Sequence, residues 1–308
     1  MSTAVISAVT VGVMLLYAVP GYLLVKSGMV SESSIPAFAK LLMYVCQPCL
    51  TVYCFGKAAF TKELIEECVI FFTVTFLLQC AALAVLFFLI HRKKDDVRLR
   101  VCSIAAVFGN CTFMGVPILE ALMPDYPQAV ILSTIFFLGM NILGWTAASY
   151  IITGDRKYIS IKKVVLNPAV IGVAVAAAIS AAGIKFPAQL EEGIALVGKM
   201  STPLCMIIIG MRLAVIPLKP MFTDKYQYAA AAFKLMIYPL AALCIGKLLS
   251  FDVNMLKTLY VLACCPTAAV VLTFAELLGE GQQTAANTVT AGTILSVLTI
   301  PLMMLAVS

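Results

Sequence analysis

The stretch Phe108–Pro117, "FGNCTFMGVP", lies inside a long apolar segment and carries the residues that most disturb a helix. Gly109 and Gly115 weaken helical structure. Pro117 lacks a backbone N–H, and in a continuous helix its ring would clash with the carbonyl of Phe113. The sequence therefore predicts an interruption within a helical segment.

The surrounding chain is too apolar for a globule in water. Apolar residues make up 62% of the 308 positions and charged residues 12%, whereas soluble domains carry about 25% charged residues. The runs Val5–Val25, Cys68–Ile90 and Ala129–Ile152 exceed the ~18 apolar residues that indicate a membrane span. They do not alternate as barrel strands do. We predict an all-α polytopic membrane protein in contact with the lipid bilayer.

Ten spans fit the chain, and the first is expected to be retained as a span because no cleavage site follows it. The predicted spans are 4–25, 36–55, 66–90, 101–123, 129–152, 166–183, 190–213, 227–249, 255–278 and 285–306.

Lys and Arg set the orientation, because cytoplasmic loops are enriched in both. With the N-terminus outside, the outer loops hold few basic residues and the inner loops hold most of them, including Arg92, Lys93, Lys94, Arg98, Arg100, Arg156, Lys157, Lys162, Lys163 and Lys219. We therefore expect both termini outside. Cytoplasmic anchoring accounts for the net charge of +6 without a nucleic-acid partner.

The two halves of the chain resemble each other. Gln47-Pro48 in the second span matches Thr202-Pro203 in the seventh, and Asn110–Leu122 in the fourth matches Pro266–Leu278 in the ninth. Five spans per half is an odd number, so the second half must be inverted. We predict two inverted five-helix repeats, residues 1–155 and 156–308, an arrangement typical of secondary transporters.

The paired interruptions indicate a binding site where they cross. Broken helices at corresponding positions of inverted repeats direct their positive N-terminal ends at one point, which favours an anion. The alternative is two ordinary proline kinks, which are common in membrane helices. The predicted substrate-binding residues are Asn110, Cys111, Thr112, Gly115, Pro117, Pro266, Thr267 and Ala268.

At these residues the sequence resembles the auxin efflux carrier family, which includes plant PIN-formed carriers and bacterial relatives described as malonate or malate permeases. Asn110–Leu119 resembles the family's fourth-helix pattern, and Asn167–Gly172 and Gly210–Leu213 are similar to its sixth and seventh spans. Pro266–Ala275 is similar to the second crossover, although Val271 stands where plant members tend to carry proline.

The resemblance implies the fold of bile-acid and sodium/proton transporters. Helices 1, 2, 6 and 7 would form a scaffold, and helices 3–5 and 8–10 a moving transport domain. It also implies a homodimer through the scaffold. Only about Thr153–Leu166 joins the halves, where plant members carry a long cytoplasmic loop, so the bacterial type is favoured.

Several polar residues within the spans are candidates for support or ion coupling. Lys234 either reaches the interface along its stem or pairs with a substrate carboxylate or Glu276. Glu120 and Glu276 are either proton-coupling groups or solvated helix ends, and Arg212 is expected to be an anchor. The remaining candidates, each of which could also bond a neighbouring helix, are Gln47, Gln79 and Asn141.

The sequence gives little support for an enzyme, a cofactor or a metal site. The leading hypothesis is a secondary or facilitative transporter in a plasma or inner membrane that moves a small organic anion, auxin-like or a dicarboxylate such as malonate or malate, by elevator-type alternating access. The alternatives are a sodium- or proton-coupled transporter of another substrate and, less favoured, a membrane sensor.

Overall fold

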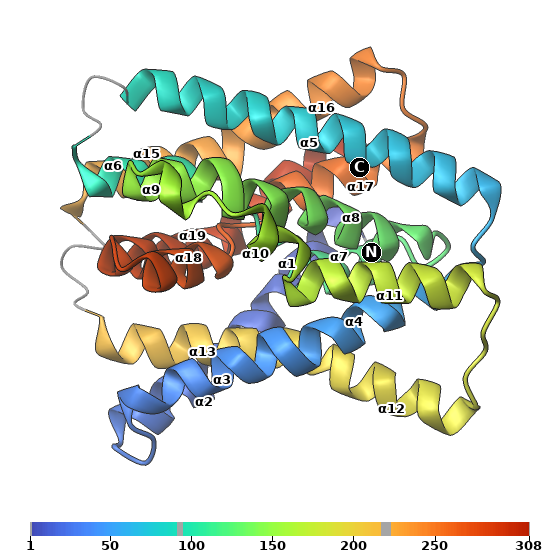
Figure 1. Ribbon diagram of the computed structural model, residues 1–308, viewed down its shortest axis with the longest axis horizontal. Helices are drawn as coiled ribbons and strands as arrows, with labels where there is room; N and C mark the ends of the chain where they lie inside the picture. Colours follow the sequence, from blue (N-terminus) through green and yellow to red (C-terminus); the bar gives the residue numbers. More distant parts are fainter. Residues whose placement is uncertain (1, 91–94, 217–222, 308) are drawn as a thin grey trace.

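The computed structural model describes residues 2–90, 95–216 and 223–307, and these are arranged as helices (Figure 1). The described residues contain no β-strand and a single isolated β-bridge, between Gly109 and Thr267. The predicted all-α architecture is therefore confirmed. Arg92, Lys93, Lys94 and Lys219, which contributed to the orientation, lie outside the described residues.

Eight helical segments of the described chain are long and apolar enough to cross a membrane. They are Thr3–Lys26, Glu32–Phe55, Lys62–Ile90, Gln128–Thr153, Arg156–Ala181, Ala188–Val215, Lys225–Leu248 and Gln282–Val307. Each overlaps one of the predicted spans. The two remaining predicted spans are interrupted helices, so the total of ten crossings stays a prediction.

The uninterrupted segments contain the following helices. In the first half of the chain they are α1 (Thr3–Leu16), α2 (Ala18–Lys26), α3 (Ile35–Leu41), α4 (Gln47–Phe55), α5 (Lys62–Ile90), α8 (Gln128–Leu143) and α9 (Ser149–Thr153). In the second they are α10 (Ile161–Val165), α11 (Pro168–Ala181), α12 (Ala188–Lys199), α13 (Ser201–Val215), α15 (Lys225–Ala232), α16 (Tyr238–Leu248) and α19 (Gln282–Met304). Short π-helical stretches join α3 to α4, α8 to α9, and α15 to α16.

The two interrupted segments each consist of two short helices. In the first half of the chain, α6 (Val97–Ala105) and α7 (Gly115–Leu122) are separated by the glycine-containing stretch Phe108–Met114. In the second, α17 (Val253–Cys264) and α18 (Val270–Leu278) are separated at Pro266. The sequence therefore located both interruptions.

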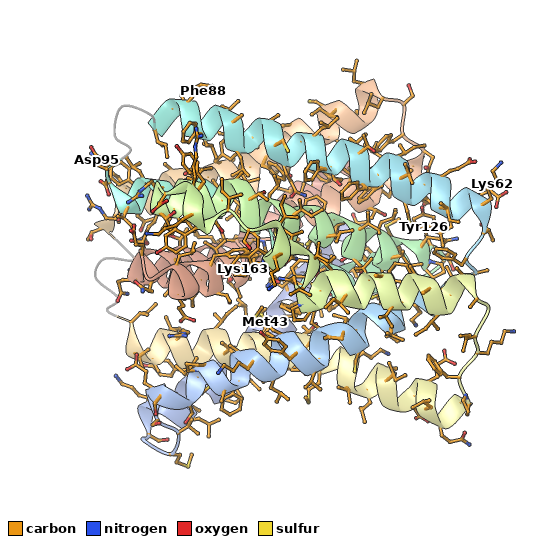
Figure 2. All side chains as sticks on the ribbon, viewed as in Figure 1. Met43, Lys62, Phe88, Asp95, Tyr126 and Lys163 are labelled. Carbon is orange, nitrogen blue, oxygen red and sulfur yellow. The ribbon has the colours of Figure 1, made fainter. Side chains whose placement is uncertain are left out.

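The outer surface of the molecule is apolar, as a lipid-facing surface requires. Phe88 is 74% exposed and Leu248 82% exposed. Figure 2 places Phe88 at an outer edge of the molecule, and places Lys62, at the start of α5, and Asp95, shortly before α6, at opposite edges. With 29 residues, α5 is about 43 Å long, enough to cross the ~30 Å hydrocarbon core.

The helices form two groups in Figure 1. Helices α2–α4 and α11–α13 lie on one side, and α5–α9 and α15–α19 on the other. The closest helix crossing in the first group joins α2 and α13, where a Cβ at Gly21 would overlap the carbonyl of Ile207 and a Cβ at Gly210 that of Ala18. Small residues permit such approach in membranes. Helix α1, by contrast, packs on α7 and α19 of the second group.

Candidate functional site

The two interrupted segments meet where each loses its helical structure. Gly109 and Thr267 form the antiparallel bridge. The amide of Asn110 donates to Pro266 O at 2.7 Å, and the amide of Ala268 donates to Phe108 O at 2.9 Å. Within a membrane, non-helical backbone must find its hydrogen bonds in the protein or in a water-filled cavity. The predicted crossing is confirmed, and part of its freed backbone is satisfied by mutual pairing.

Hydroxyl groups from other elements satisfy three further carbonyls at the crossing. Thr267 Oγ1 donates to Ala105 O, at the end of α6, at 2.9 Å. Ser133 Oγ of α8 donates to Cys111 O at 2.8 Å, and Thr202 Oγ1 of α13 donates to Phe113 O at 2.7 Å. The interruption is therefore held open by the surrounding helices.

The prolines mark the edges of the interruptions. Helix α7 begins at Gly115, so Pro117 is its third residue, in the first turn, where its missing N–H would have no intrahelical partner. Pro266 lies in the stretch before α18, which begins at Val270. The expected clash between Pro117 and the Phe113 carbonyl does not arise, because the chain is not helical at Phe113.

The N-terminus of α18 presents unused donors. Among the described residues, the amides of Ala269 and Val270 have no hydrogen-bond acceptor. In α7, by contrast, the amide of Gly115 bonds Asn110 O and that of Val116 bonds Thr112 O, both at 3.2 Å. Free amides and the helix dipole together favour an anion. Of these two helices, α18 is the one that offers both.

A cavity of about 60 Å³ lies beside this end of α18. It is bounded by α3, α4, α11 and α13 on one side and by α8, the Phe113 region and α18 on the other. Its lining consists of Ala39, Leu42, Met43, Gln47, Phe113, Phe137, Asn141, Asn167, Pro168, Ala169, Cys205, Ile208, Arg212, Ala269, Val270, Leu272, Thr273 and Glu276. An apolar pocket with a few placed polar groups is typical of small-molecule sites.

Gln47 is the most informative of these polar groups. It is 3% exposed, and neither Nε2 nor Oε1 has a hydrogen-bond partner among the described residues. Gln47 begins α4 directly after the π-helical stretch Leu42–Cys46, a feature that is frequent at functional sites. An unpartnered buried amide requires an explanation, and a bound ligand supplies one.

Asn110 also has a buried side-chain amide without a partner in the described part of the chain, but it does not line the cavity. Its side chain is 3% exposed, and its Nδ2 has no partner among the described residues. It lies beside the thiol of Cys205, and Cys205 lines the cavity.

Arg212 and Glu276 form an ion pair at the edge of the cavity. Their side chains are 16% and 32% exposed. The sequence predicted that Arg212 anchors the end of a span. In the structure it also pairs with Glu276. It joins α13 to the second half of the interrupted segment across the cavity.

The sequence predicted the position of the crossing correctly, but it predicted few of the residues that line the cavity. In the described structure, the predicted residues that line the cavity are Gln47, Asn141 and Glu276, all from the supporting set, and none of the eight predicted substrate-binding residues does so. Asn141 Nδ2 donates to Phe137 O at 2.9 Å, and Gln79 Nε2 donates to Phe136 O at 3.4 Å. These two amides are thus partly used within the protein.

Phe113, Cys205 and Arg212 line the cavity and were not predicted as site residues. Phe113 and Cys205 give no polar or charged signal by which sequence reasoning could have found them. Arg212 stands 155 residues after Lys57, the offset that also relates Gln47 to Thr202, and this correspondence was the available signal.

No group of three or more His, Cys, Asp and Glu side chains within the described residues is arranged to hold a metal ion. The 11 cysteines are free thiols in the structure.

An all-helical membrane protein whose interrupted helices cross beside a cavity with unused helix amides belongs to the class of membrane transporters. A model of the family described as "Membrane transport protein" matches the chain twice, over residues 5–164 and 156–304. The chain belongs to this family, the auxin efflux carrier family that Asn110–Leu119 resembles. A comparison with curated proteins gives no match.

Proposed function

We propose that this membrane transporter carries a small organic anion, auxin-like or a dicarboxylate such as malonate or malate. The observation that carries the proposal is that Ala269 and Val270, whose amides are unused, line the same cavity as Gln47, whose side-chain amide has no partner among the described residues. A carboxylate accepts hydrogen bonds from all three donors and is attracted by the helix N-terminus.

The cavity supports a small substrate with an apolar part. Its volume of about 60 Å³ has room for roughly four water molecules. Apart from the polar groups, the wall consists of residues such as Met43, Phe137 and Ile208. A short carbon chain or a ring edge would contact these while its carboxylate binds at α18.

The position of the cavity supports an elevator-type movement. It lies between α4, α11 and α13, which belong to the expected scaffold, and α8 and α18, which belong to the expected transport domain. Sliding one group of helices along the other would carry a ligand bound at α18 from one side of the membrane to the other.

Coupling through Glu120 or Glu276 is a weaker candidate, because both carboxylates already have partners. Glu120 accepts a hydrogen bond from Tyr53 Oη at 2.7 Å and lies 3.9 Å from Lys57 Nζ. Glu276 is paired with Arg212. Neither carboxylate is therefore free to bind a proton or a sodium ion without first losing its partner.

Uptake of labelled malonate, malate and indole-acetate into proteoliposomes tests the proposal. We expect saturable uptake of at least one of them under an imposed proton, sodium or voltage gradient. In parallel, thermal unfolding with each anion should show stabilisation that Gln47→Met reduces, because Gln47 lines the cavity. Absence of flux for all organic anions would overturn the proposal, and binding without flux would favour the sensor.

The proposal also places both termini outside, in a plasma or inner membrane, with two copies paired through the scaffold. A membrane-impermeant amine reagent should then label Lys185 and spare Lys163 on intact cells. The opposite pattern would invert the topology.

A further inference from the structure

Lys234 is a fully buried cation next to the crossing. It lies in the π-helical stretch Phe233–Ile237 between α15 and α16, and its exposed fraction is 0%. The sequence left open whether its stem reaches the interface, and complete burial excludes this. Glu276, the other expected partner, is bound to Arg212. Among the described residues no carboxylate lies within 4.0 Å of the Lys234 ammonium.

The ammonium is held by backbone and by an aromatic ring. Nζ donates to Ala263 O at 2.7 Å and lies 4.6 Å from the centre of the Tyr238 ring. A Cβ on Gly109 would stand 3.0 Å from both Cε and Nζ of Lys234. The lysine thus touches both interrupted segments, and glycine at position 109 leaves the space that it needs.

The carbonyl that Lys234 binds belongs to a site that favours cations. Ala263 is in the last turn of α17, which ends at Cys264, so its carbonyl has no intrahelical donor. The C-terminal end of a helix carries about half a negative charge. In transporters with interrupted helices, such C-terminal ends and unwound carbonyls bind the coupling cation.

We propose that the ammonium of Lys234 takes the place of a coupling cation at the crossing, so that the anion is carried without sodium or potassium ions. This inference rests on the proposed function for its transport part only. Lys234 acts as a positioning residue: it neutralises the α17 end and holds the crossing in shape behind the anion.

The internal repeat supports an intrinsic cation in one half only. Gln79 stands 155 residues before Lys234, the offset that relates Gln47 to Thr202. Gln79 is also fully buried, but its amide bonds Phe136 O of α8 and carries no charge. The second half of the chain therefore supplies one positive charge at the crossing, and the matching position in the first half supplies none.

The first test needs no substrate. Thermal unfolding of the purified full chain is measured in sodium chloride, methylammonium chloride and N-methylglucamine chloride at equal ionic strength. We expect the wild type to unfold at the same temperature in all three. Lys234→Met, with its α17 end vacated, should unfold at a lower temperature in N-methylglucamine and regain several degrees in sodium or methylammonium. Lys199→Met removes an exposed lysine and should respond as the wild type does.

Gly109→Ala provides a second variant that keeps the lysine. Its methyl group displaces the ammonium, so the unfolding temperature should fall in all three salts. Gly12→Ala is the matched control, because a Cβ there meets nothing within 4 Å. If Lys234→Met does not fold, a sodium-independent wild type together with a destabilised Gly109→Ala still supports the proposal. Equal behaviour of the two alanine variants would overturn it.

Flux measurements separate the two proposals. With an anion that the wild type carries, wild-type uptake should be unchanged when N-methylglucamine replaces sodium and potassium. The uptake rate of Lys234→Met should be at least tenfold lower than that of the wild type. A wild type that needs or is stabilised specifically by sodium overturns the role of Lys234 and leaves the anion function standing. If no anion is transported but the unfolding temperatures respond to salt as expected, the proposed anion transport is wrong and the proposed role of Lys234 as a built-in cation is retained.

Discussion

Glu276 of α18 and Arg212 of α13 are paired across the cavity, and the first half of the chain contains a similar relationship. Glu120 of α7 lies 3.9 Å from Lys57, which follows α4, and accepts a hydrogen bond from Tyr53 of α4. Glu120 precedes Glu276 by 156 residues, and Lys57 precedes Arg212 by 155. Each interrupted segment therefore carries, near its C-terminal end, a carboxylate that binds the expected scaffold: Glu276 through the guanidinium of Arg212, and Glu120 through the hydroxyl of Tyr53.

Arg212→Gln is expected to destabilise the protein by about 1–2 kcal/mol. Removing one member of a buried ion pair costs about 3–5 kcal/mol, and the partial exposure of this pair reduces the effect. The double variant Arg212→Gln/Glu276→Gln should recover part of the loss, because no charge is left unpaired. Thermal or denaturant unfolding in detergent measures both.

Lys62→Gln is the control for this pair. Lys62 and Glu66 form an exposed ion pair on α5, with side chains 86% and 63% exposed, and such pairs contribute less than about 1 kcal/mol. Strict additivity of the two substitutions in the Arg212–Glu276 cycle would show that the residues do not interact.

Gln47→Met is expected to separate stability from binding. Neither polar atom of Gln47 has a partner among the described residues, so an apolar side chain of similar length should leave the unfolding temperature unchanged or raise it. The apparent affinity for a carried anion, measured from the stabilisation that the anion gives, should fall at least fivefold, because one hydrogen bond to an ionised group is lost.

Gln227→Met is the matched control. Gln227 is also 3% exposed, and its Oε1 also lacks a partner among the described residues, but it lies in α15 and does not line the cavity. It should leave anion binding unchanged. If Gln47→Met destabilises the protein strongly and binds anion as the wild type does, Gln47 is a structural residue.

The interruptions were predictable because they depend on the residue types within the interrupted stretch itself. Gly109, Gly115 and Pro117 disfavour a helix whatever surrounds them, and the second interruption follows from its offset to the first. The all-α membrane architecture followed likewise from long apolar runs, since only helices and closed barrels satisfy the backbone in lipid.

The cavity wall was not predictable in the same way. Phe113 and Cys205 line it through the packing of α13 against the crossing, which no local pattern encodes. Ser133 and Thr202 bind carbonyls of the interruption, but buried hydroxyls in membrane helices usually bond their own helix, as Thr134 and Thr290 do here. Tertiary contacts decided which hydroxyls reach across.

Thr267→Val should destabilise the crossing by about 1–3 kcal/mol. The variant is nearly isosteric, but it leaves Ala105 O, at the end of α6, without the hydroxyl that Thr267 supplies at 2.9 Å. Thr290→Val is the control, because Thr290 Oγ1 bonds Ala286 O within its own helix. Equal unfolding temperatures for the two variants would mean that water replaces the Thr267 hydroxyl.

Asp96→Asn tests how charge fixes the start of α6. Asp96 is the N-cap: its carboxylate accepts from the Arg98 amide at 3.0 Å and pairs with the Arg98 guanidinium at 3.0 Å. The hydrogen bond from the Arg98 side chain is the main reason why the pKa of Asp96 is lowered, and the backbone amide adds to it. Asn is an equally good cap, so the substitution removes the charge and keeps the cap.

A lowered pKa means that Asp96 contributes stability above its ordinary pKa, about 3.9, and loses it as the pH falls through the lower folded-state value. At pH 7 the wild type should therefore exceed Asp96→Asn by about 0.5 kcal/mol, the size typical of an exposed pair at a helix start. The difference in unfolding temperature should shrink as the pH is lowered from 5 towards 3 (approximate limits set by the ordinary pKa). A difference that stays constant or grows over this range would show that the carboxylate of Asp96 is not the stabilising group.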